Sequence, residues 1–109
     1  MTDLELTKMC AEAMGLIPTG CGAHVPLPQH DSAVRVSPGK KANFWYDPLH
    51  DDAQAMALVK KLNLCIESPD PYNDAERWHV STGYSETLSM NADLNRAIVE
   101  CVAKMQAAA

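Results

Sequence analysis

One segment of the chain carries residue types that bind metal ions. Cys21, His24 and His30 lie close together, and a thiolate with two imidazoles is part of the ligand set of a structural zinc site. A complete tetrahedral site needs a further ligand, for which Asp31 is one candidate. Loops also gather cysteine and histidine without binding metal, and we therefore predict no metal site and no cofactor here.

A second segment has some features of a phosphate-binding loop. Gly39 and Lys40 match part of that signature, but Val34 stands where the signature requires its first glycine, and Lys41 stands where it requires serine or threonine. Residues 37–40 are therefore predicted to form the tip of a hairpin. Arg35, Lys40 and Lys41 still form one local basic group, which keeps binding of a small phosphorylated ligand as an alternative.

Acidic residues concentrate in two runs, and these runs are the strongest candidates for a binding surface. The first surrounds the start of a predicted helix near residue 50, and the second flanks the loop before a predicted strand at Trp78. Loops carry binding residues more often than the elements they connect. The alternative is that the first run serves the helix dipole and the second is simply solvated. The predicted partner-binding residues are Asp51, Asp52, Glu67, Asp70, Asp74 and Glu76.

We predict no enzymatic activity. Serine, histidine and aspartate are all present, but no Gly-x-Ser-x-Gly signature of a nucleophilic serine occurs. Asp51 and Asp52 are adjacent carboxylates at a predicted helix start, where helix capping explains them without general acid–base chemistry.

Size and charge limit the kinds of protein this chain can be. Its 109 residues, 47% of them hydrophobic, can bury one core, so residues 1–109 are predicted to form a single domain. Nine basic against fourteen acidic residues give a net charge of −5, which disfavours direct nucleic-acid binding and favours a basic protein partner. The N-terminus is acidic before Lys8 and no apolar stretch could span a bilayer, so we expect a cytosolic protein with reduced cysteines and no membrane partner.

Capping residues predict two helices in the first two thirds of the chain. A capping box at Thr2 and Glu5 begins the first helix, which Gly15 ends. Asp47 is the predicted N-cap of the second helix, with Pro48 at its first position, and Asn63 closes it in the left-handed conformation.

A third helix is predicted from an uninterrupted apolar stripe near the C-terminus. Ser89 or Asn91 is its expected cap, and Asp93 is expected in its first turn. The spacing i, i+3, i+4, i+7, i+8, i+11 places one set of side chains on a single face. These residues are Leu94, Ala97, Ile98, Cys101, Val102 and Met105.

Four strands are predicted between the helices, at residues 33–36, 43–46, 64–66 and 77–81, with a further short strand at 23–25 left open. The first two form a hairpin. Short connections imply mostly antiparallel pairing, and amphipathic helices need a sheet to cover. We therefore expect an α+β fold: a small α/β/α sandwich with one sheet of about four strands covered by three helices.

The strands also carry adjacent aromatic residues, Trp45 with Tyr46 and Trp78 with His79. Neighbouring side chains on a strand face opposite sides, so at most one of each pair belongs to the core. An exposed partner would mark a contact surface.

Residues 46–56, Tyr46-Asp47-Pro48-Leu49-His50-Asp51-Asp52-Ala53-Gln54-Ala55-Met56, resemble the aromatic-x-Pro-(Ser/Leu)-x-Asp-(Asp/Ile)-x-x-Ala motif of the phage ABA sandwich domain family. Residues 94–102 are similar to the closing helix of that family. The resemblance implies an α/β/α sandwich encoded by a bacteriophage or prophage, and it carries over no catalytic residues. The long Pro/Gly-rich stretch after the first helix departs from the family pattern.

Together, the resemblance and the acidic surface predict a function in binding. We expect an accessory protein in the cytoplasm of a bacterial host, which inhibits a host protein such as a nucleic-acid-handling CRISPR defence complex. The alternative is a sponge that captures a nucleotide signal between two protomers through Arg35, Lys40 and Lys41 with an aromatic platform, and this leaves a homodimer open.

Overall fold

The computed structural model describes residues 2–19, 28–37, 43–70, 72, 76–82 and 88–108, and the structural statements below refer to them. The elements in chain order are α1 (Asp3–Ala13), β1 (Ile17–Pro18), β2 (Val34–Ser37), β3 (Phe44–Tyr46), α2 (Asp52–Leu62), β4 (Cys65–Glu67), β5 (Trp78–Ser81), β6 (Ser89–Asn91) and α3 (Leu94–Ala108).

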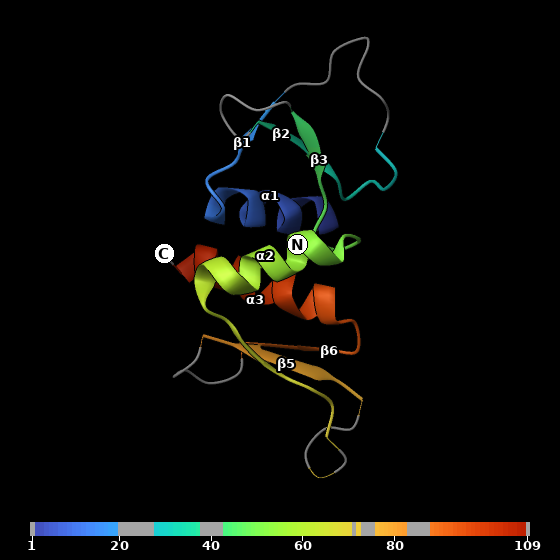
Figure 1. The fold of residues 1–109 in the computed structure, drawn as a ribbon, viewed down its shortest axis with the longest axis vertical. Coiled ribbons are helices and arrows are strands. Elements are labelled where there is room, and N and C mark those ends of the chain that lie inside the picture. The colour runs from blue at the N-terminus through green and yellow to red at the C-terminus, as the bar shows by residue number, and fades with distance from the viewer. Residues whose placement is uncertain are drawn as a thin grey trace.

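The helices lie between two separate antiparallel sheets (Figure 1). Strands β1-β2-β3 form one three-stranded sheet and β4-β5-β6 form the other. The α+β class, the three helices and the antiparallel pairing are as predicted for the described residues. The prediction of an α/β/α sandwich with a single sheet is wrong. The order of layers is reversed, and the helices lie in the middle.

The burial of α3 gives the physical reason for this arrangement. All six residues of its predicted stripe are buried or half-buried, but Val99 and Ala103 are buried as well. A helix that is apolar on more than one face requires cover on several sides. It contacts α1 and α2 as well as β5 and β6. The helix therefore forms the centre of the molecule, with one sheet beyond each side of the helical layer.

The ends of α1 agree with the sequence prediction. The Thr2 hydroxyl accepts a hydrogen bond from the Glu5 amide at 3.2 Å, and the Glu5 carboxylate accepts one from the Thr2 amide at 3.1 Å. Gly15 follows the helix with φ = +73°, a conformation that glycine adopts without steric cost.

The other two helices begin at different residues from those predicted. The N-cap of α2 is Asp51, whose carboxylate accepts from the Gln54 amide at 3.0 Å. Asp47 does not cap α2, because its carboxylate bonds other side chains and residues 48–50 form a turn. Asp93 accepts from the Arg96 amide at 3.4 Å at the start of α3. Ser89 and Asn91, its predicted caps, belong to β6 instead.

The end of α2 and the hairpin strands are confirmed. Asn63 has φ = +53° and closes α2, whose buried face contains Ala55 and Leu58. Strands β2 and β3 pair antiparallel, with Arg35 opposite Trp45. The predicted hairpin tip and the open strand at 23–25 lie outside the described residues, apart from Ser37, which ends β2.

The aromatic pairs alternate as expected. Tyr46 is buried in the core and Trp45 is half-buried on the other face of its sheet, while Trp78 packs against the core and His79 lines a hollow on the outside. Among the helices of the described residues, none is both long and apolar enough to cross a membrane.

Candidate functional site

Part of the second acidic run lies beside a hollow on the β4-β5-β6 sheet. The hollow has a volume of about 820 Å³, and Glu67, Asp70, Arg77, His79 and Met90 are among its lining residues. Strand pairing brings three of them together, because Glu67 lies opposite His79 and His79 lies opposite Met90. These positions face away from Val80, which is fully buried against the helices. We call this surface, comprising Glu67, Asp70, Arg77, His79 and Met90, the acidic outer face.

An exposed tyrosine follows the acidic outer face in the loop after β4. The side chain of Tyr72 is 94% exposed, and its backbone amide donates a hydrogen bond to the Asp70 carboxylate at 2.8 Å. This short-range bond is an aspartate turn, which fixes the backbone locally. Tyr72 was not among the predicted site residues, although its position between Pro71 and Asn73 in a predicted loop was a usable signal.

The remaining predicted site residues are not brought to the same place. Asp51 caps α2, and the Asp52 carboxylate accepts from the Asn95 side chain at 2.8 Å. Asp51 and Asp52 line two further hollows, each different from that of Glu67 and Asp70. Glu76 is exposed, and Asp74 lies outside the described residues. At least part of the acidic run near residue 50 therefore stabilises the fold. This agrees with the alternative that these residues serve the helix start.

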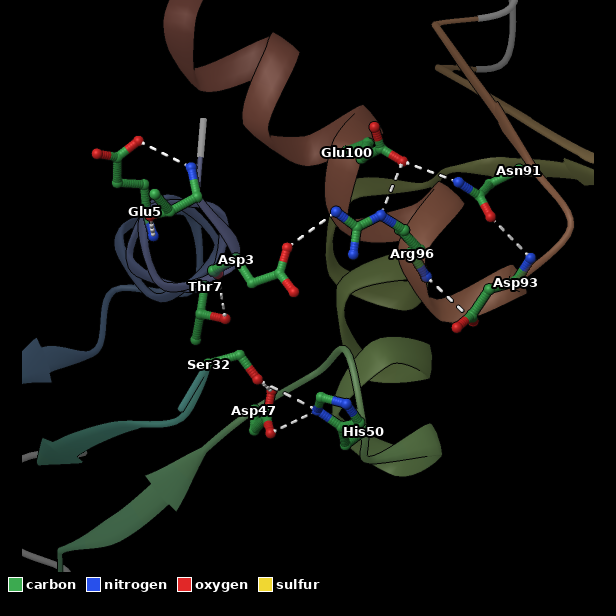
Figure 2. Close-up of polar contacts among 11 residues, drawn as sticks. Asp3, Glu5, Thr7, Ser32, Asp47, His50, Asn91, Asp93, Arg96 and Glu100 are labelled. Carbon is green, nitrogen blue, oxygen red and sulfur yellow. Dashed lines mark hydrogen bonds and ion pairs between the residues drawn. The ribbon is translucent and has the colours of Figure 1, made fainter. Parts of the chain in front are cut away.

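A second polar cluster joins residues from separate segments (Figure 2). The Ser32 hydroxyl lies 2.8 Å from Asp47 Oδ1 and 3.2 Å from His50 Nδ1. His50 Nδ1 is also 2.9 Å from Asp47 Oδ2. In a nucleophilic triad the serine and the aspartate contact opposite nitrogens of the ring. Here both contact Nδ1, and Ser32 is only 4% exposed, so the cluster does not have the geometry of that triad.

His30 stacks on the outer side of this cluster. Its ring centre is 3.7 Å from that of His50, and the two planes differ by 14°. Nitrogen lone pairs lie in the ring plane, so those of two stacked rings run nearly parallel and do not converge on one metal ion. Within the described ranges, no group of three histidine, cysteine or acidic side chains could hold a metal. Cys21 and His24 lie outside those ranges, and the absence of a metal site stays a prediction.

A network centred on Arg96 ties α1 to α3 (Figure 2). Its guanidinium is 2.8 Å from Asp3 and 3.7 Å from Glu100, and the Asn91 amide donates to Glu100 at 3.3 Å. The hydrogen bond from Arg96 lowers the pKa of Asp3, and the same bond raises the pKa of Arg96. These contacts join secondary-structure elements, so we assign the network a structural role.

Of the three residues in the predicted basic group, only Arg35 lies among the described residues. The guanidinium lies over the Trp45 indole, 5.6 Å from the ring centre. Within the described part of the chain, no carboxylate forms an ion pair with Arg35. Lys40 and Lys41 lie outside the described residues.

The cysteines of the described residues differ in environment. Burial raises the pKa of Cys10 to about 12 and that of Cys101 to about 11. Cys65 is exposed at the start of β4, and all three are free thiols. A buried thiol of high pKa carries little thiolate and is chemically inert.

Comparisons of this chain with models of known protein families, with curated proteins and with solved structures give no match. The resemblance to the phage ABA sandwich family thus stays a sequence-based prediction, and the function is argued from the geometry above.

Proposed function

We propose that this chain is a bacteriophage accessory protein that binds a basic host protein through the acidic outer face and Tyr72. The observation that carries the proposal is the combination of a hollow lined by Glu67 and Asp70 with a tyrosine that is 94% exposed and whose amide donates to Asp70. The bacteriophage origin and the bacterial host rest on the sequence resemblance alone.

The physical support for a protein partner is the kind of side chain displayed. Tyrosine supplies a large, rigid contact area and is enriched in the residues that dominate binding energy. The aspartate turn at Asp70 holds the Tyr72 backbone, which reduces the entropy lost on binding. An exposed aromatic side chain on a backbone held by a carboxylate is therefore well suited to a protein contact.

The charge of this region favours a basic partner. Residues 67–77 contain four acidic side chains, Glu67, Asp70, Asp74 and Glu76, and one basic side chain, Arg77. Complementary charges increase the association rate and discriminate against acidic partners. The carboxylates of Glu67 and Asp70, which line the hollow, could occupy phosphate sites of a nucleic-acid-handling protein, such as a component of an antiviral defence complex.

Capture of host proteins by matched variants tests the proposal. Glu67→Gln with Asp70→Asn removes two charges and keeps an acceptor at Asp70 for the Tyr72 amide. Tyr72→Ala removes the anchor. Glu12→Gln, at an exposed position of α1, is the control. We expect the double variant and Tyr72→Ala each to weaken capture of one specific basic protein about thirtyfold or more, because hot-spot truncations cost about 2 kcal/mol or more. The control should leave capture unchanged.

Salt gives an independent readout of the same proposal. Surface charges are screened over about 10 Å at 0.1 M salt and about 3 Å at 1 M. Capture by the wild-type chain should therefore weaken as the salt concentration rises. The double variant Glu67→Gln with Asp70→Asn should depend less steeply on salt. Capture that withstands both high salt and the three substitutions would contradict the proposal.

The nucleotide sponge remains a second candidate because one observation favours it. Arg35 lies over Trp45 on the face of β2 and β3 that points away from the buried Val34 and Val36, and it has no carboxylate partner among the described residues. A guanidinium beside an aromatic ring can bind a phosphorylated aromatic ligand. A thermal-shift screen with cyclic and linear nucleotides should raise the melting temperature of the wild type and not of Arg35→Gln. No shift with any nucleotide would exclude this candidate.

A further inference from the structure

A hollow distinct from the acidic outer face lies where β3 leads into α2. It has a volume of about 300 Å³, and Trp45, His30, His50, Asp47 and Asp51 are among its lining residues. It is thus near the lower size limit of ligand pockets, roughly 300 Å³. We call it the His50 hollow. It contributes nothing to the function proposed above.

The polar cluster sets which nitrogen His50 presents to the hollow. Asp47 Oδ2 lies 2.9 Å from His50 Nδ1, so the hydrogen of the neutral ring belongs on Nδ1 and the lone pair on Nε2. The Ser32 hydroxyl donates to Asp47 Oδ1 at 2.8 Å and holds that carboxylate in place. The Asp47 side chain is only 11% exposed, whereas the His50 side chain is 44% exposed. His50 lines the hollow, and in this tautomer Nε2 is the ring nitrogen left to accept a hydrogen bond.

The charge of the lining favours a cation. Asp47 and Asp51 contribute two carboxylates, and the described lining contains no lysine or arginine. The N-terminus of α2 opposes them with roughly half a positive charge, which is smaller than the charge of either carboxylate. One oxygen of the Asp51 carboxylate accepts a hydrogen bond from the Gln54 amide, and the Asp51 side chain is exposed.

The aromatic rings among the lining residues favour a planar cation. Trp45 and the stacked rings of His30 and His50 border the hollow. A guanidinium is planar, stacks on aromatic faces and donates several hydrogen bonds in its plane, whereas an ammonium is a compact point charge. Arg35 already lies over the same indole, 5.6 Å from the ring centre, so a second guanidinium can stack only on the part of the ring that Arg35 leaves free and is repelled by its positive charge.

We propose that the His50 hollow binds a guanidinium group, with Asp51 and His50 Nε2 as its acceptors and Trp45 as its stacking surface. The group belongs either to a free small molecule or to an arginine side chain of a protein. Both sources share the same chemistry, and the experiment below distinguishes them.

Nitrogen-15 NMR with methylguanidinium chloride as the probe tests the proposal. The resonances of His50 Nε2 and of the Trp45 indole should shift saturably at concentrations far below those that denature proteins. Sodium chloride at equal ionic strength, and sodium acetate, should not cause this change. An absent or unsaturable shift, or an equal shift with acetate, would overturn the proposal.

Two matched variants link the effect to Asp51. Asp51→Asn should weaken methylguanidinium binding about tenfold, because it removes the charge. Asparagine is as good an N-cap as aspartate, so α2 should remain intact. Asp31→Asn removes the same charge from an exposed neighbour of His30 that is absent from the lining, and it should bind as the wild type does. Equal affinities of both variants would contradict the assignment of Asp51.

A blocked Gly-Arg-Gly tripeptide distinguishes the two sources of the guanidinium. Tighter binding of the tripeptide than of methylguanidinium would identify an arginine side chain of a protein as the ligand. Weaker binding of the tripeptide would identify a free small molecule. Failure of both ligands would reject the site and leave the protein-binding proposal untouched, because the acidic outer face shares no described residue with this hollow.

Discussion

The buried hydroxyl of Tyr46 has an unusual environment. The residue is 2% exposed, and its oxygen has no hydrogen-bond partner in the described part of the chain. Burial raises the pKa of this phenol, because the charged form is poorly solvated. A buried polar group without a partner costs free energy, about 1 kcal/mol or more. Tyr46 therefore contributes to the core through its ring and not through its hydroxyl.

Tyr46→Phe should leave the free energy of unfolding unchanged or raise it by up to about 1 kcal/mol, since it removes an unpaired hydroxyl and keeps the ring. Urea denaturation at neutral pH measures the change. Tyr72→Phe, at a fully solvated position, is the matched control and should have no effect. A loss of stability above about 1 kcal/mol for Tyr46→Phe would show that the hydroxyl has a bonding partner.

The ion pair of Asp3 and Arg96 predicts a pH dependence of stability. Arg96 lowers the pKa of Asp3 in the folded chain. The stability from this carboxylate is therefore complete above the pKa of Asp3 in the unfolded chain and disappears as pH falls through the lower folded pKa. Because the pair is partly exposed, the effect is at most about 1 kcal/mol. Asp3→Asn should flatten the acid limb of a stability–pH curve. Identical acid limbs for variant and wild type would contradict this.

At the same scale, the sequence could predict part of the candidate site. Glu67 and Asp70 were selected and do line one hollow. The cluster of Ser32, Asp47 and His50 was not predicted, because its members come from separate segments that only the tertiary fold brings together. A short sequence window contains no information about such distant contacts.

At the scale of elements, local signals located the helices well. The capping box at Thr2 and the left-handed Asn63 depend on neighbouring residues only. The start of α2 was predicted one turn early, because Asp47-Pro48 and Asp51 are both good starting signals. Tertiary contacts of Asp47 with Ser32 and His50 decide between them. Strands β1 and β6 were missed, since Ile17-Pro18 and Ser89-Met90-Asn91 contain few strand-favouring residues.

The central helix α3 should be the least tolerant element. Ile98 is fully buried, and Ile98→Asp would place a charge in the core, so we expect loss of the cooperative unfolding transition. Ile98→Val should cost about 1 kcal/mol and keep the fold. Circular dichroism during heating measures both. A melting curve of Ile98→Asp close to that of the wild type would contradict the central position of α3.

At the scale of the whole molecule, the helical layer separates two different surfaces (Figure 1). The acidic outer face belongs to the β4-β5-β6 sheet. Arg35 and Trp45 belong to the β1-β2-β3 sheet beyond the opposite side of the helices. The predicted single sheet did not contain this separation. A partner bound at one sheet should leave the other sheet accessible.

Hydrogen exchange of the chain, alone and in complex with the captured host protein, tests the central claim most directly. The account predicts slower amide exchange at β4 and through Tyr72, with little change at β2 and β3. Slower exchange confined to β2 and β3, with β4 and Tyr72 unchanged, would contradict a partner bound at the acidic outer face.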